Sequence, residues 1–356
     1  MKRSFWYPFL VLLAFGGGCA GKGEQTTPTL YGFFPTPAKV SIDSLLVTLN
    51  GISKHADVVM LQERVPWADF ASGPDAVSRA FADLKNLVGL VDDRGLGRIF
   101  VVDPLNGLDR RQFIGVPEEW GEPSFADERI RAAYKNFALR LAREFEPQYL
   151  GLGSEINTYL ATYPDDAADF VSLYRETYDA VKAEFPDMKV FLTFQWDHLV
   201  HPEAYGLPPT EGVDWRMIEQ FEPRLDVWAI SSYPCFYFRN RPIPADYYEP
   251  LTRRTGKPLA VAEGGCSSVT VGEVPGSPED QIRYLRAIDD QLGRRLQFWI
   301  YLLYNDLDLE SYRDATGGDF SDENLQTLSY FVNMGLADVR GRAKEALLIW
   351  DGIRSR

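Results

Sequence analysis

Short apolar runs alternate with segments of helical periodicity along most of the chain. The runs are too short for helices and are bounded by glycine or polar residues, which is typical of buried strands. They cover residues 30–34, 58–62, 98–103, 149–155, 189–195, 227–233, 259–263 and 298–304. Eight such runs match the number of strands in a closed β/α barrel.

The segments between these runs have the spacing of amphipathic helices. Apolar residues recur every three or four positions over 130–145 and over 170–185. Ser277 and Pro278 are followed by two acidic residues, which predicts a capped helix start.

An open doubly wound sheet is the alternative fold, and it expects a glycine-rich turn after the first strand. Residues 33–38 contain no glycine. We therefore predict an α/β fold, a (β/α)8 TIM barrel, as one domain over residues 29–356.

The overall charge limits the possible partners. The chain has 356 residues and a formal net charge of -14. This acidic balance argues against a nucleic-acid partner and against binding to anionic membrane surfaces.

The N-terminus predicts export. Lys2 and Arg3 precede an apolar run over 5–15 that is too short to span a bilayer. Three glycines then precede Cys19, and this resembles a bacterial lipobox, although Gly16 stands where leucine is usual. The resemblance implies a signal peptide over 1–19, a lipid on Cys19, a tether over 20–28, and a protein anchored to a bacterial membrane or cell surface through that lipid only. An ordinary signal peptide is the alternative.

Cys235 and Cys266 are the remaining cysteines. They follow two neighbouring predicted strands, and export permits oxidation, so they are candidates for a disulfide.

Two of the apolar runs end in a glutamate, Glu155 in one and Glu263 in the other. Barrel enzymes keep their chemistry at the carboxyl ends of the strands. Gly151, Gly153 and Glu155 have the same parity, so we expect them on one face, with room beneath the carboxylate. Retaining glycosidases use two carboxyl groups about 5 Å apart, one as acid and the other as nucleophile. The alternative is a structural ion pair at each glutamate.

Three short motifs resemble clan A glycoside hydrolases. The segment Gly153-Ser-Glu-Ile-Asn157 is similar to the fourth strand of that clan, and closest to the Gly-Asn-Glu-Ile-Asn pattern of family 53 endo-β-1,4-galactanases. Ala262-Glu-Gly-Gly265 resembles the seventh strand, and Ser231-Ser-Tyr-Pro234 resembles the end of the sixth. The resemblance covers essentially the whole predicted barrel.

This resemblance implies a role for each matched residue. Glu155 would be the acid/base, Glu263 the nucleophile and Tyr233 a hydrogen-bond partner of the nucleophile. Ser154 stands where the clan has an asparagine that holds the sugar's 2-hydroxyl, and a serine offers one donor instead of two.

The mix of residues at other strand ends suits a sugar cleft, because sugars offer C–H faces to aromatic rings and hydroxyls to carboxylates and amides. The expected sugar-contacting residues are Glu63, Asp103, Ser154, Asn157, Gln195, Trp196 and Tyr304. The expected partner is a β-linked poly- or oligosaccharide.

We expect no cofactor and no metal. His198 and His201 have i, i+3 spacing, but no third ligand pattern joins them.

Two other functions stay open. A glycan-binding lipoprotein without catalysis is kept open by Ser154. The second alternative is a barrel enzyme that binds a phosphorylated metabolite, because Gly264, Gly265 and the serines that follow could bind phosphate. The acidic segment 305–310 argues against it, since it would repel phosphate.

Overall fold

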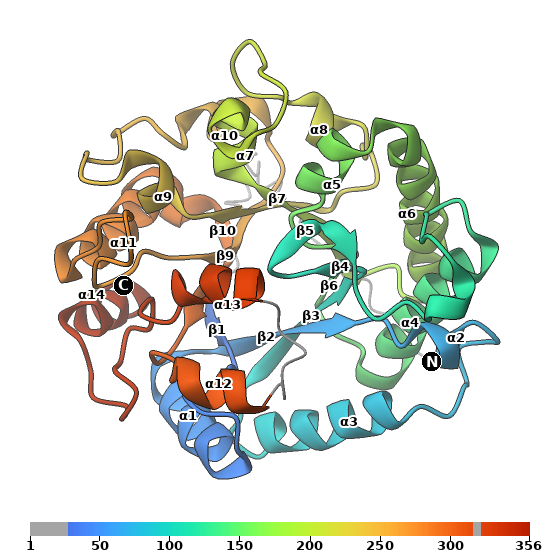
Figure 1. Ribbon diagram of the computed structural model, residues 1–356, viewed down its shortest axis with the longest axis horizontal. Coiled ribbons are helices and arrows are strands. Elements are labelled where there is room, and N and C mark those ends of the chain that lie inside the picture. The colour runs from blue at the N-terminus through green and yellow to red at the C-terminus, as the bar shows by residue number, and fades with distance from the viewer. Residues whose placement is uncertain (1–27, 316–321) are drawn as a thin grey trace, which may run out of the picture.

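The computed structural model describes residues 28–315 and 322–356. Eight parallel strands close into a barrel in the order β1-β10-β9-β8-β7-β6-β3-β2. Helices surround this barrel as an outer ring (Figure 1). The strands are β1 (Leu30–Phe34), β2 (Val58–Arg64), β3 (Gly97–Asp103), β4 (Leu105–Asn106), β5 (Asp109–Phe113), β6 (Tyr149–Gly151), β7 (Lys189–Gln195), β8 (Val227–Ser232), β9 (Leu259–Gly264) and β10 (Leu296–Leu303). The predicted (β/α)8 barrel is confirmed.

The helices follow the strands in the expected alternation. They are α1 (Ile42–His55), α2 (Trp67–Phe70), α3 (Arg79–Asp92), α4 (Glu128–Phe145), α5 (Ile156–Thr162), α6 (Pro164–Glu184), α7 (Trp196–Val200), α8 (Arg216–Glu219), α9 (Pro234–Phe238), α10 (Glu249–Arg254), α11 (Pro278–Leu292), α12 (Leu309–Ala315), α13 (Asp322–Ser329) and α14 (Glu345–Arg354). Ser277 caps α11, and its hydroxyl accepts from the backbone N–H of Asp280 at 3.2 Å.

Two apolar layers hold the barrel. Inward-facing side chains such as Met60, Val101, Phe191 and Ile300 fill its interior. A larger layer lies between the strands and the helices, because the outward-facing strand residues are also apolar. This double burial is typical of parallel sheets.

The fourth apolar run departs from the prediction. Its strand ends at Gly151, where an added Cβ would meet Val101 and Phe191 of the barrel interior. Gly153 has φ +134°, and a Cβ there would meet Leu192 and Phe170 of the outer layer. The two glycines therefore do not share a face with Glu155, because the chain turns at Gly153 and strand parity ends there.

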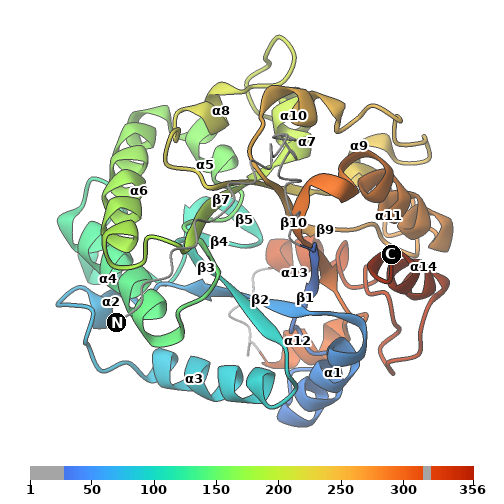
Figure 2. The same cartoon turned by 180° about the vertical axis from the view of Figure 1, so that it is seen from behind.

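A hairpin made of β4 and β5 follows β3, and the sequence prediction missed it. Asn106 pairs with Asp109, which leaves a two-residue loop of Gly107 and Leu108. The hairpin lies in front of the barrel in Figure 1, with α12 and α13, and behind it in Figure 2. Since the hairpin follows the carboxyl end of β3, it marks this end as the mouth.

The predicted signal peptide, Cys19 and the tether up to residue 27 lie outside the described residues. Within 28–315 and 322–356, no helix is both long and apolar enough to cross a membrane.

Candidate active site

Glu155 reaches the barrel mouth through an unusual backbone conformation. It precedes α5 with φ 49° and ψ 36°, in the left-handed region, which costs a non-glycine residue roughly 1–2 kcal/mol. Its backbone N–H donates to Thr193 Oγ1 at 2.8 Å, on the neighbouring strand β7. The surrounding contacts hold the backbone in this conformation, and they direct the carboxylate into the mouth.

Both carboxylate oxygens of Glu155 accept hydrogen bonds. Arg110 Nε donates to Oε2 at 2.9 Å, and Ser231 Oγ donates to Oε1 at 2.5 Å. All three residues are buried, with Glu155 7 % exposed. The two bonds hold the carboxylate of Glu155 in a fixed orientation.

Glu263 lies near the end of β9, next to β8. The hydroxyl of Tyr233 donates to its Oε1. Burial, and then the charge of Glu155, raise the pKa of Glu263 to about 7, and Arg110 and the Tyr233 hydrogen bond offset part of that rise. A carboxyl group with this pKa exchanges its proton near neutral pH.

Ser231 connects the two glutamates. It is the register partner of Glu263 across strands β8 and β9, and its hydroxyl binds Glu155. The charge of Glu155 raises the pKa of Glu263, so the two carboxylates lie close enough to interact electrostatically. Their predicted separation of about 5 Å stays a prediction.

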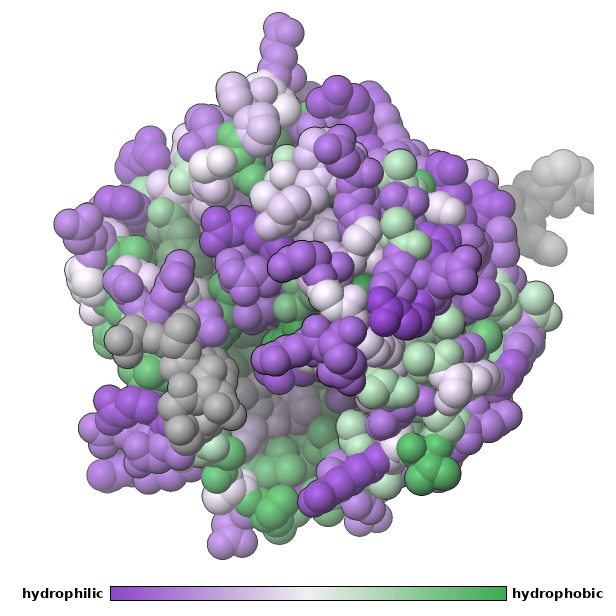
Figure 3. Space-filling view, turned by 45° about the vertical axis from the view of Figure 1, so that its right-hand side comes forward, coloured by the Kyte–Doolittle hydropathy of each residue, from purple (hydrophilic) through white to green (hydrophobic). Residues whose placement is uncertain are grey.

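Two cavities open at the mouth. One, of about 580 Å³, is lined by Glu263, Asp103, Gln62 and several leucines. The other, of about 480 Å³, is lined by Glu155, Gln195, Tyr233 and Phe236 among others. Arg110 lines both. Figure 3 shows a hollow on this side of the molecule, with apolar residues (green) gathered along its lower edge.

Four of the expected sugar-contacting residues lie around this site. Asp103 lines the first cavity and Gln195 the second. Ser154 is 1 % exposed, and its hydroxyl lies 3.2 Å from both Arg110 Nη2 and Thr193 Oγ1. Asn157 braces the strand end instead, because its side-chain amide bonds the backbone N–H and carbonyl of Gln195 at 2.8 and 3.2 Å.

The other three expected residues line neither cavity. Trp196 is fully buried in the outer apolar layer beside Tyr247 and Tyr248. The ring of Tyr304 packs against helix α1 at Gly51, on the outside of the barrel. Glu63 has the outward parity of β2, whereas its neighbour Gln62 faces Asp103 at 2.7 Å. These three predictions chose the wrong face of the strand end.

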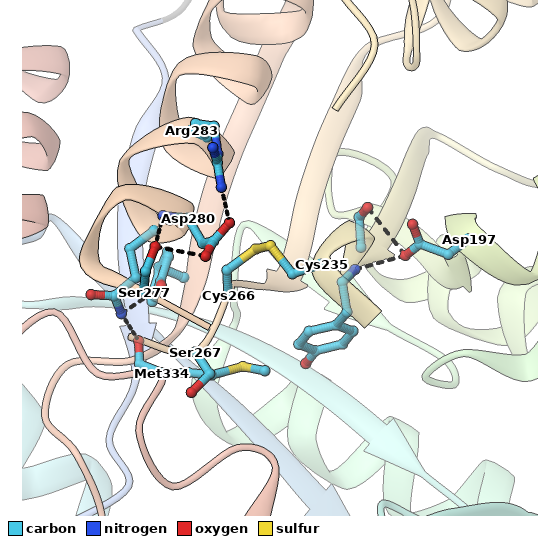
Figure 4. Close-up of a disulfide and its surroundings, with 12 residues drawn as sticks. Asp197, Cys235, Cys266, Ser267, Ser277, Asp280, Arg283 and Met334 are labelled. Atoms are coloured by element: carbon cyan, nitrogen blue, oxygen red, sulfur yellow. Dashed lines mark hydrogen bonds and ion pairs between the residues drawn. A yellow bond between two sulfur atoms is a disulfide. The ribbon is translucent and has the colours of Figure 1, made fainter. Parts of the chain in front are cut away.

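Cys235 and Cys266 form a disulfide with their Cα atoms 5.7 Å apart. It joins α9, just after β8, to the loop just after β9 (Figure 4). On its β8 side, the carboxylate of Asp197 accepts from the backbone N–H of Tyr233 at 2.7 Å. The segments that carry Tyr233 and Glu263 are therefore fastened to each other, and Tyr233 is also fastened to α7, which follows β7 directly.

The two histidines have separate surroundings. His198 Nδ1 lies 2.8 Å from Thr158 Oγ1, and burial lowers the pKa of His198 to about 4. His201 stacks on Tyr237 with ring centroids 3.6 Å apart. Within residues 28–315 and 322–356, no three His, Cys, Asp or Glu side chains cluster as a metal site would require.

Arg110 and Ser231 are the site residues that sequence reasoning missed. Arg110 also binds Asp103 Oδ2 through Nη1 at 2.6 Å, so it links two carboxylates. The dipeptide Asn106-Gly107 is a hairpin signal and marked the turn that carries Arg110. Ser231 lay inside a motif already noted, but nothing in the sequence showed which way its hydroxyl points.

No protein-family model matches the sequence, and no curated protein matches it. Solved structures do match it. A variant of GH5_18 from Bifidobacterium longum subsp. longum ATCC 55813, in complex with Manβ1-4GlcNAc, superimposes with a TM-score of 0.65 at 14 % identity, over 92 % of this chain and 78 % of that one. The exo-β-1,4-mannosidase Op5Man5 from Opitutaceae bacterium strain TAV5 gives 0.63 at 15 %, over 91 % and 59 %. A family 39 glycoside hydrolase from Bacteroides cellulosilyticus WH2 gives 0.56 at 15 %, over 92 % and 64 %.

These structural neighbours are clan A glycoside hydrolases with the same closed barrel. At such low identities the likeness shows the fold. The neighbours give no specific support to the family 53 resemblance.

Proposed function

We propose that the protein is a retaining β-glycoside hydrolase that uses Glu155 and Glu263 in a double displacement. The observation that carries the proposal is the pair itself. The two glutamates follow separate strands to the mouth of the barrel, the charge of Glu155 raises the pKa of Glu263, and each has its own hydroxyl donor.

The roles follow the resemblance of the strand motifs. Glu155 would protonate the oxygen of the leaving group and later activate water, while Glu263 attacks the anomeric carbon. Tyr233 supports Glu263 through its hydrogen bond. The leaving group would then occupy the cavity beside Glu155, and the sugar that is transferred would occupy the cavity beside Glu263.

The substrate class is a β-linked poly- or oligosaccharide. β-Mannosides are the first candidates, because an exo-β-1,4-mannosidase and a complex with Manβ1-4GlcNAc are among the structural neighbours. β-1,4-Galactan comes next, because of the Gly153–Asn157 motif.

The test is a screen of β-mannosides, β-galactans and other β-glycans, with the release of reducing ends as the readout. Glu263→Gln is the matched control, since it keeps the volume of the side chain and removes the nucleophile. Release by the wild type and none by Glu263→Gln supports the proposal. Equal release by both proteins, or none by the wild type on any glycan, contradicts it.

A second candidate is a glycan-binding protein without catalysis. Arg110 favours it, because its ion pair at 2.9 Å occupies an oxygen of the proposed acid Glu155. The short Ser154 favours it as well. Binding of a glycan in the screen without release of reducing ends would select this candidate.

For localisation, we propose export and a lipid anchor at Cys19. The support is the sequence of the N-terminus alone, and an exported enzyme suits the breakdown of external glycans.

A further inference from the structure

The guanidinium of Arg110 makes a hydrogen bond with each of its three nitrogens. Nε donates to Glu155 at 2.9 Å, Nη1 to Asp103 at 2.6 Å, and Nη2 to Ser154 at 3.2 Å. Arg110 is 7 % exposed, so water screens these bonds poorly. Only the planar fork of arginine can bridge three acceptors in this way, and the ammonium group of a lysine cannot.

Arg110 also borders both cavities at the mouth. It lines the cavity that contains Glu263 and the one that contains Glu155, and of the residues that line both it is the charged one. A glycoside cleaved by this pair must contact both glutamates, so its leaving group competes with the guanidinium of Arg110 for the carboxylate of Glu155.

The hydrogen bonds around the pair are the reverse of what a general acid at Glu155 requires. Arg110, which is a donor only, occupies Oε2 of Glu155, and Ser231 donates to Oε1, so both oxygens of Glu155 act as acceptors. The pKa of Glu263 is raised to about 7 by burial and by Glu155, so Glu263 holds a proton part of the time near neutrality. The other groups that face the pair are Asp103, the Tyr233 hydroxyl and His198, which is neutral because burial lowers its pKa to about 4. A general acid at Glu155 needs the opposite distribution.

We propose that Arg110 is a positioning residue whose ion pair with Glu155 holds the empty cleft in an inactive charge arrangement, and that a glycoside bound across both cavities displaces the guanidinium from Glu155. The inference rests on the proposed function. Asp103 keeps the displaced guanidinium close, because it is a second partner held in place by Gln62.

The proton balance of the displacement is simple. Once Arg110 leaves Glu155, the proton on Glu263 moves to Glu155, and Glu263 becomes the ionised nucleophile. Glu155 then gives this proton to the glycosidic oxygen as the bond from that oxygen to the anomeric carbon breaks, and Glu263 forms the new bond to that carbon.

The test compares Arg110→Met with Arg110→Lys, and uses Gln112→Ala as the control. Gln112 is exposed on the same hairpin and lines neither cavity. Each protein is assayed on two β-glycosides of the sugar identified in the screen, one with an alkyl leaving group and one with a dinitrophenyl leaving group. Only the alkyl glycoside depends strongly on the general acid.

In Arg110→Met, kcat/KM for the alkyl glycoside should rise roughly fivefold or more at neutral pH. The pH profile of kcat/KM should also move to higher pH, because the charge of Arg110, which lowers the pKa of Glu263, has gone. The dinitrophenyl glycoside should change little, and Gln112→Ala should stay near the wild type on both. Arg110→Lys keeps the positive charge but cannot make all three bonds, so its kcat/KM for the alkyl glycoside should lie between those of the wild type and Arg110→Met.

An equal fall of kcat/KM on both glycosides in Arg110→Met, or an unchanged pH profile, overturns the inference while the proposed function stands. If Arg110→Met fails to fold, the double variant Asp103→Asn/Arg110→Met removes the unpaired carboxylate and takes its place, with the same expectations. If neither the wild type nor these variants cleave any glycoside, the proposed function fails and the inference fails with it.

Discussion

The hydroxyl of Tyr233, one residue past β8, donates a hydrogen bond to Glu263 Oε1 on β9. This bond favours the ionised carboxylate and offsets part of the rise caused by burial and by Glu155, which together leave the pKa of Glu263 at about 7. In Tyr233→Phe the pKa of Glu263 should rise further, so the nucleophile ionises only at higher pH. The acidic limb of the kcat/KM profile should move up by about one pH unit.

Tyr312→Phe is the matched control for that measurement. It removes a hydroxyl that donates to the backbone carbonyl of Pro37 at 2.7 Å, away from both glutamates. The two variants should therefore differ in the position of the acidic limb. If both have the limb of the wild type, the Tyr233 bond has no influence on the nucleophile.

The two glutamates should respond differently to azide. Glu155→Ala should form the glycosyl-enzyme from an aryl glycoside and then stall, because the leaving group needs little acid but water needs a base. Azide needs no base, so it should restore turnover and give a β-glycosyl azide, measured by NMR of the product. Rescue of Glu263→Ala with an α-azide product would instead exchange the two roles.

The disulfide should contribute substantially to the free energy of unfolding. Cys235 and Cys266 are 31 residues apart, and opening such a loop typically costs about 3 kcal/mol. The double variant Cys235→Ser/Cys266→Ser should lose roughly that free energy of unfolding in urea. Thiol counting in denatured Cys19→Ser protein should find no free thiol, and two free thiols would contradict the bond.

Lys344 should anchor the segment before α14 to the barrel mouth. Its Nζ binds Asp306 Oδ1 at 2.6 Å and Ser268 Oγ at 2.9 Å, and Asp306 is 8 % exposed. Lys344→Met leaves this buried carboxylate without its counter-ion, which should cost about 3 kcal/mol of unfolding free energy. Lys344→Met/Asp306→Asn should recover part of the loss. Arg342→Met is the control and should change little, because Arg342 is the exposed partner of its ion pair with Asp338.

The lipid anchor predicts a simple fractionation result. If Cys19 carries a lipid, the wild type should sediment with membranes and Cys19→Ser should appear in the soluble fraction. Equal distribution of the two proteins would leave an ordinary signal peptide as the explanation of the N-terminus.

Strand positions were predictable because burial on both faces makes each strand a continuous apolar run. Strands β1 and β7 have the predicted bounds, and most others differ by one or two residues. The strand predicted over 149–155 was too long, because the apolar composition continues past Gly151 while the backbone turns at Gly153. A turn that depends on the backbone conformation of one glycine leaves no periodic pattern of apolar residues in the sequence.

The glutamates were predictable for the same reason, since each follows an apolar run directly. The side chains around them were harder. Trp196 and Tyr304 follow strands just as closely, yet they face the helices, because one residue of register decides the face. Arg110 comes from a short polar hairpin with no apolar pattern, and its role depends on long-range contacts that local sequence does not encode.

Because β1 pairs with β10, the barrel can close only after β10 has been synthesised. Leu30 to Phe34 lie beside Phe298 to Leu303, so the first strand finds one of its two neighbours only after nearly the whole chain has been synthesised. Trp350 of α14 then packs on Tyr31 and Phe33 and covers that closure. Until then the nascent chain has an open edge at β1, and joining ends so distant in sequence is slow. A truncation before β10 should therefore yield no stable smaller barrel, and proteolysis during synthesis should find the early strands unprotected.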